Sequence, residues 1–134
     1  MSKPTYQSQE IADITGLPIS TLRYYERIGL LDPVERADNG HRLYSDRDIL
    51  RVEFLKRVRA TGMSIKEMQH YVNLYREGES TLIERKRILS AHRTTILAQM
   101  DELQDTVDFL DMKIDRYTRE EHSLSEKENT LVSE

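Results

Sequence analysis

The sequence predicts a mainly helical protein, in which a winged helix-turn-helix domain precedes one long C-terminal helix. Two short helical patterns are separated by Gly16 and Pro18, which is typical of a helix-turn-helix. Further along, Asn39-Gly40 is a dipeptide that favours a tight hairpin turn, and it predicts a small wing. From about Thr81 apolar residues recur at intervals of seven, which indicates a coiled coil.

Composition agrees with one small core and an extension. The 134 residues are 37% hydrophobic and 33% charged, which is rich in charge for a compact globule. No apolar run is long enough to span a bilayer, and the N-terminus lacks the apolar core of a secretory signal. We therefore expect a cytoplasmic protein with no membrane partner. Because the chain has no cysteine, thiolate metal sites, disulfides and thiol switches are excluded.

The net charge of -4 hides two chemically different halves. Residues 1–76 carry twelve Lys/Arg against ten Asp/Glu, whereas residues 77–134 carry eight against fourteen. The charge changes sign near Glu77. We predict a winged helix-turn-helix domain over 1–77, a dimerisation helix over 78–119 and a flexible tail over 120–134.

In the first segment Ser8 can cap a short helix whose residues Ile11 and Ile14 face inward. The second helix, over about 18–28, separates an apolar side from a basic and aromatic side. The apolar side consists of Ile19, Leu22 and Tyr25. The other side, which we expect to be exposed, consists of Ser20, Arg23, Tyr24 and Arg27.

The wing is predicted from Val34 to Tyr44, on either side of the Asn39-Gly40 turn. Two further helices follow it. Ser45 with Asp48 resembles a capping box and opens the first, and Ser64 with Glu67 opens the second. The predicted order is helix, helix, wing, helix, helix.

Two interleaved series of residues form the heptad seam of the long helix. The first is Leu82, Leu89, Ile96, Leu103, Leu110 and Tyr117, and the second is Met100, Val107 and Ile114. Lys86 and Arg93 occupy seam positions where apolar residues are expected, so pairing should be better in the C-terminal half. We predict dimer contacts at Leu89, Ile96, Met100, Leu103, Val107, Leu110, Ile114 and Tyr117. The last residues show no clear period and predict a frayed tail.

The second helix of a helix-turn-helix enters the DNA major groove, so its exposed face should reach bases and phosphates. Arginine can bind guanine through two hydrogen bonds, and a tyrosine hydroxyl can donate to phosphate. The predicted DNA-binding residues are Ser20, Arg23, Tyr24 and Arg27 on the helix, and His41, Arg42 and Tyr44 on the wing. The plainer interpretation, solvated arginines paired with Glu26, is outweighed by the gathering of Arg and Tyr on one face.

Three stretches resemble the MerR family of transcription regulators: TLRYYERIGLL at Thr21–Leu31, NGHRLYSDRDI at Asn39–Ile49 and RATGMSIKEM at Arg59–Met68. The resemblance covers roughly residues 6–75 and implies that the long helix makes an antiparallel coiled coil in a homodimer. It also implies binding to a pseudo-palindromic operator inside a promoter, whose distortion controls RNA polymerase indirectly. His41 stands where family members often have tyrosine.

The resemblance does not specify an effector. Metal-sensing and iron-sulfur members use cysteines, and drug-sensing members have far longer C-terminal regions. The chain looks most like the small subgroup associated with aldehyde and electrophile stress, but residues 54–59 offer no cysteine there. An effector-gated activator and a constitutive repressor or architectural protein both stay open.

Other functions fit the sequence less well. His41, His70, His92 and His122 lack the spacing of a metal site, and we expect no metal or other cofactor. A small-molecule pocket could involve Tyr71, Tyr75, Met63, Met68 and Met100, although at helical spacing these are more often core. No catalytic motif is recognisable, so we expect no enzyme. A coiled-coil adaptor that binds protein is the main rival, and the basic, aromatic helix face argues against it.

Overall fold

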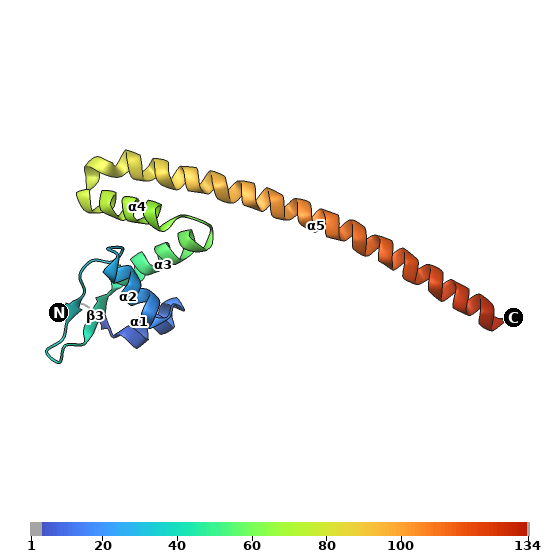
Figure 1. Cartoon of the computed structure of the whole chain (residues 1–134), viewed down its shortest axis with the longest axis horizontal. Helices are drawn as coiled ribbons and strands as arrows, with labels where there is room; N and C mark the ends of the chain where they lie inside the picture. The colour runs from blue at the N-terminus through green and yellow to red at the C-terminus, as the bar shows by residue number, and fades with distance from the viewer. Residues whose placement is uncertain (1–3, 134) are drawn as a thin grey trace. The chain divides into compact units, whose positions relative to one another are not determined.

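The computed structural model describes residues 4–133, with side chains up to residue 130, and it divides at Ser90 and Ala91 into two compact units. Figure 1 shows the elements along the chain. They are β1 (Thr5–Tyr6), α1 (Ser8–Thr15), α2 (Ile19–Arg27), β2 (Glu35–Arg36), β3 (Arg42–Ser45), α3 (Asp46–Ala60), α4 (Ile65–Glu77), the 3-10 turn η1 (Glu79–Thr81) and α5 (Leu82–Ser133). The predicted mainly helical fold class with a winged helix-turn-helix is confirmed.

Local rules explain where α1 and α2 end and begin. Gly16 closes α1 with φ of 74°, a conformation that glycine adopts without strain, and its N–H donates to the Ala12 carbonyl at 2.8 Å. Pro18 then forms the N-cap of α2. The N-cap of α1 is Gln7, whereas the sequence predicted Ser8 as the cap. The Gln7 N–H donates to the Glu10 carboxylate at 3.1 Å.

The α1 helix buries a different set of side chains from the one we predicted. Ile11 is buried, but Ile14 is 52% exposed, so the expectation that Ile14 faces inward is wrong. Thr15 takes the inward position instead, because its hydroxyl donates to the Ile11 carbonyl at 2.7 Å and needs no partner outside the helix.

The wing is a three-stranded antiparallel sheet in the order β1-β3-β2, one strand more than predicted. Thr5 pairs with Ser45, and Glu35 pairs with Leu43. The predicted turn is present, because Gly40 has φ of 84° and the Ala37 N–H donates to the His41 carbonyl at 2.8 Å. The added strand β1 ties the start of the chain to the wing.

The predicted caps of α3 and α4 are confirmed. Ser45 and Asp48 exchange hydrogen bonds at the start of α3, and the Glu67 N–H donates to the Ser64 hydroxyl at 3.1 Å. A single core joins α1–α4 and the wing. Its fully buried side chains are Tyr44, Ile11, Leu22, Leu30, Leu31, Leu55, Met63, Met68, Val52, Val72 and Thr15.

Helix α5 runs from Leu82 to Ser133 without a break. The segment 120–133, for which we predicted a frayed tail, is therefore helical. Leu124 lies seven residues after Tyr117, so the first seam series continues into this segment, and this continuation sustains the helical pattern. None of the helices in the described part of the chain has the length and hydropathy to cross a bilayer.

Candidate nucleic-acid interface

Helix α2 presents the two faces that its sequence predicts. Leu22 and Tyr25 are buried in the core, and burial raises the pKa of the Tyr25 hydroxyl. Ser20, Arg23, Tyr24 and Arg27 are all exposed on the opposite side. The Arg27 guanidinium lies 5.6 Å from the centre of the Tyr24 ring, so the ring restrains one of the arginines that the face presents.

A shallow depression of about 320 Å³ brings the helix and the wing together. It is lined by Gln7, Ser8, Gln9, Ile19, Arg23, Gly40, His41 and Arg42. The predicted residues Arg23, His41 and Arg42, which are distant in sequence, therefore lie on one surface. Sequence reasoning missed Gln7 to Gln9 at the start of α1, and the run of polar residues just before the first apolar position was the available signal.

Arg42 connects the wing to α2. Its Nε donates to the Glu26 Oε2 atom at 3.0 Å, and both side chains are largely covered. In the wing turn, Arg36 Nη1 donates to the Gly40 carbonyl at 2.9 Å. This ion pair links the wing to α2, a contact that the sequence did not reveal.

Tyr44 does not lie on this surface. Its side chain is fully buried, so it cannot contact DNA from its place in the core, and its predicted DNA-binding role is wrong. Burial is the main cause of the raised pKa of its hydroxyl, and the Ser8 side chain acts in the opposite direction. The contact with Ser8 does not have hydrogen-bond geometry, so the hydroxyl is without a hydrogen-bond partner among the described residues.

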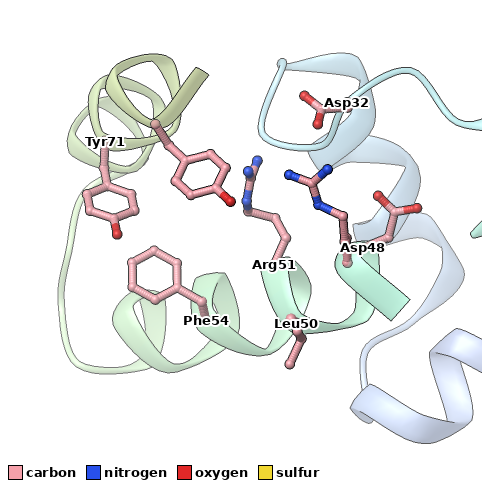
Figure 2. A pocket seen from close by; sticks show the side chains of 8 residues that line it. Asp32, Asp48, Leu50, Arg51, Phe54 and Tyr71 are labelled. Carbon is pink, nitrogen blue, oxygen red and sulfur yellow. The ribbon is translucent and has the colours of Figure 1, made fainter. Parts of the chain in front are cut away.

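A second, open pocket of about 250 Å³ lies between α3 and α4 (Figure 2). The Phe54 and Tyr71 rings are 4.9 Å apart, and the Arg51 guanidinium lies 4.9 Å from the centre of the Tyr75 ring. Its acidic groups already have partners: Asp32 accepts from Arg76, and Asp48 caps α3. The pocket therefore offers a ligand mainly aromatic rings and cationic side chains.

The five residues that could have lined a small-molecule pocket lie partly in the core and partly on the surface. Met63 and Met68 are buried in the core, whereas Tyr71 and Tyr75 line the second pocket. Met100 is exposed on α5 in the other unit. Within the part of the chain that the structure describes, no three His, Asp or Glu side chains gather as they would around a metal ion.

The predicted dimer residues form an uncovered apolar stripe on α5. Ile96 is partly covered, and the others are exposed by between 36% at Leu89 and 66% at Leu103. The others are Leu89, Met100, Leu103, Val107, Leu110, Ile114 and Tyr117.

These features define a class of protein. A recognition helix with an exposed basic face, next to a wing that adds cationic side chains to the same surface, is the arrangement of a winged helix-turn-helix DNA-binding regulator. Comparison with known proteins gives the family. Residues 6–74 match the model described as MerR HTH family regulatory protein, and residues 49–113 match the one described as MerR, DNA binding. The chain belongs to the MerR family of DNA-binding transcriptional regulators.

Individual relatives agree with this assignment. The Bacillus subtilis HTH-type transcriptional regulator AdhR is 43% identical over 88 residues, which are 66% of this chain and 63% of that protein. This chain thus matches less than two thirds of that relative's length. A crystal structure of a Listeria monocytogenes MerR family regulator has a TM-score of 0.78 and 37% identity, covering 84% of this chain and 85% of that one.

A further solved structure is of HiNmlR, a MerR family regulator lacking the sensor domain, bound to promoter DNA. Its TM-score is 0.81 at 30% identity, and the match covers 86% of this chain and 87% of that chain.

Proposed function

We propose that this chain binds a pseudo-palindromic promoter operator as a homodimer and distorts the DNA to control transcription. The observation that carries the proposal is the convergence of Arg23, His41 and Arg42 on one surface depression. A relative of similar fold was solved bound to promoter DNA, which supports the same use of this surface.

In the proposed complex α2 lies in the major groove. Arg23, Tyr24 and Arg27 are exposed on it and can reach base edges and phosphates, while Ser20 can donate to the backbone. The wing contributes His41 to the phosphates that flank the groove. Arg42 serves mainly to hold the wing against α2 through Glu26.

Regulation requires two such surfaces at a fixed separation, because the half-sites of an operator are fixed on the duplex. The exposed heptad seam supplies the means, since pairing two copies would cover its apolar side chains. Bending or untwisting between the half-sites changes how promoter elements are presented, so RNA polymerase is an indirect partner. Acting on promoter DNA also places the protein in the cytoplasm.

The test is titration of the protein onto DNA upstream of its own and neighbouring genes at two salt concentrations, followed by footprinting. We expect protection of a short inverted repeat and weaker binding at higher salt, because phosphate contacts release counterions. Arg23→Ala should weaken operator binding by about 1–3 kcal/mol, which is roughly tenfold to a hundredfold.

The matched control is Arg119→Ala, which removes the same charge from the exposed surface of α5. It should leave affinity for the operator unchanged. Equal affinities of the two variants, with folding intact by circular dichroism, would contradict the placement of Arg23 in the interface.

A further inference from the structure

The open pocket between α3 and α4 combines aromatic rings with a guanidinium group, and DNA binding makes no use of either. The Phe54 and Tyr71 rings belong to different helices, and their centres are 4.9 Å apart. Figure 2 shows the Arg51 side chain between these two rings and the carboxylates of Asp32 and Asp48. A ligand that enters this pocket therefore meets flat apolar surfaces and a cation together.

The Arg51 guanidinium is held in place without using all of its donors. It lies 4.9 Å from the centre of the Tyr75 ring, and its Nη1 donates to the Leu30 carbonyl at 3.3 Å. The Tyr75 ring also contacts the Arg85 guanidinium, which donates to the Gly78 carbonyl at 3.2 Å. Within the described residues, Nε and Nη2 of Arg51 form no hydrogen bond or ion pair. These two N–H groups can bind both oxygens of a carboxylate side by side.

The acidic side chains of the pocket are already engaged elsewhere. Asp32 accepts from the Arg76 guanidinium at 2.8 Å, and Asp48 accepts from the N-cap N–H of α3 at 2.8 Å. Arg47 also lines the pocket, is exposed, and forms no hydrogen bond or ion pair with any described residue. Counting Arg76, three guanidinium groups stand around two carboxylates. Their excess of positive charge favours an anionic ligand over a cationic one.

The size of the pocket restricts the ligand to one ring. Its volume is about 250 Å³. Benzene occupies an engineered protein cavity of about 150 Å³, so a single ring with a small substituent fits here. Aromatic side chains favour a ring as the apolar part of the ligand, because offset or edge-to-face ring pairs are more stable than their buried area alone would give. The carboxylate-binding edge of Arg51 favours a carboxylate as the substituent.

We propose that this pocket binds a monocyclic aromatic carboxylate, with its ring against Phe54 and Tyr71 and its carboxylate on Nε and Nη2 of Arg51. Arg47 adds attraction at the opening. The inference goes beyond DNA binding, because none of these residues lines the depression between α2 and the wing. The two proposals can therefore fail separately.

Benzoate is the probe that tests the site. Nuclear magnetic resonance titration of the full chain without DNA should show saturable binding, with a Kd of about 1 mM or lower. The largest shifts should occur at the backbone amides of Arg51, Phe54 and Tyr71. Benzamide keeps the ring without the charge, and acetate keeps the charge without the ring. Each should bind at least about tenfold more weakly than benzoate.

Three substitutions in the pocket separate the parts of the site. Arg51→Lys keeps the positive charge but loses the planar pair of donors, so benzoate should bind about tenfold more weakly. Phe54→Leu removes a ring from the pocket and should weaken binding by roughly threefold to tenfold. Arg47→Gln removes an exposed charge that has no partner in the described residues, so the fold should be kept. It should weaken binding about twofold to fivefold at low salt.

The matched control is Arg57→Gln, which removes one charge from an exposed position of α3 outside the pocket. It should bind benzoate within about twofold of the natural chain, because screening weakens distant charges. No saturation by about 20 mM benzoate, or equal binding of benzamide, overturns the proposal. So does a folded Arg51→Lys or Arg47→Gln variant that binds benzoate as well as Arg57→Gln does. Operator binding is measured separately, and its loss would overturn the proposed function alone.

Discussion

The N-terminal unit and the distal part of α5 differ in how far their apolar residues are buried. In the N-terminal unit, Leu22, Leu30 and Leu55 are completely buried by neighbours in the same chain. Beyond Ala91, Met100, Leu103 and Ile114 are all more than half exposed, although their spacing is just as regular. The first unit buries its core within one chain. In the second unit the regularly spaced apolar residues stay exposed in a single chain.

The two apolar patterns lead to different kinds of packing. The apolar residues of α1–α4 pack against one another within the chain, so a single copy is enough to bury them. A long helix without tertiary packing gains little stability from its backbone hydrogen bonds, because most helix stability in proteins comes from a packed apolar face. The distal helix should therefore depend on a second chain for its stability, and the N-terminal unit should not.

The largest expected effect comes from placing charge in the seam. Leu103→Asp with Leu110→Asp should weaken dimerisation roughly a thousandfold or more, because four carboxylates would enter a paired apolar seam. Sedimentation should show monomers, and circular dichroism should show loss of helix from α5. The variant Gln104→Asp with Met112→Asp adds acidic groups off the seam and should remain dimeric. A dimeric Leu103/Leu110 variant would show that the seam is wrong.

The next largest effect distinguishes a buried leucine from an exposed leucine in the same helix. Leu55 and Leu50 both belong to α3, but Leu55 is fully buried and Leu50 is 71% exposed. Leu55→Ala should lower the free energy of unfolding by about 2–5 kcal/mol through lost contacts and a cavity. Leu50→Ala should change it by less than about 0.5 kcal/mol in urea unfolding. Similar losses for both would mean that α3 is packed differently.

Features governed by local rules were predictable from sequence. The turn at Gly16 and Pro18, the faces of α2, and the caps at Ser45 and Ser64 each depend on residues within one or two helical turns. Features that depend on distant pairing were not. Strand β1 has two residues and forms only because Thr5 and Tyr6 meet β3, so no local pattern announces it.

The candidate site shows the same division. Exposure of Arg23 and Arg27 follows from helix periodicity, but the partner of Arg42 lies on another element and has no signal in the sequence. Tyr44 was misplaced because one polar hydroxyl in a short strand suits either face of the sheet. The helical end of α5 was missed although Leu124 keeps the seven-residue spacing, because its neighbours are polar.

A smaller effect is expected from the link between the wing and α2. Glu26→Gln removes the charge that holds Arg42 but keeps an oxygen that can accept its hydrogen bond. The wing should loosen, and operator affinity should fall by about 1 kcal/mol, or roughly fivefold. Glu53→Gln on α3 is the control for loss of one negative charge and should bind as the natural chain does. If Glu26→Gln and Glu53→Gln bound the operator equally well, the ion pair between Arg42 and Glu26 would have no part in positioning the wing.

The smallest effect concerns the buried hydroxyl of Tyr44. Tyr44→Phe removes a group with no hydrogen-bond partner in the described residues, so stability at pH 7 should stay within about 1 kcal/mol or rise. Operator affinity should not change, whereas a surface contact predicted from sequence would require it to fall. A loss of affinity in the gel shift would return Tyr44 to the DNA interface.

The same variant has a pH signature with a definite sign. Burial raises the pKa of Tyr44 in the folded chain above its usual value of 10.0, so the folded state holds this proton more tightly than the unfolded state. The resulting contribution to stability is complete below pH 10 and is lost as pH rises from there through the folded pKa. Urea unfolding between pH 9 and 11 should therefore show a shallower decline for Tyr44→Phe. Tyr25, whose pKa is raised by burial, and Tyr6, whose pKa is raised by its hydrogen bond to Asp46, contribute to the decline that remains. Identical slopes for the variant and the natural chain would mean that the Tyr44 ring does not stay buried in solution.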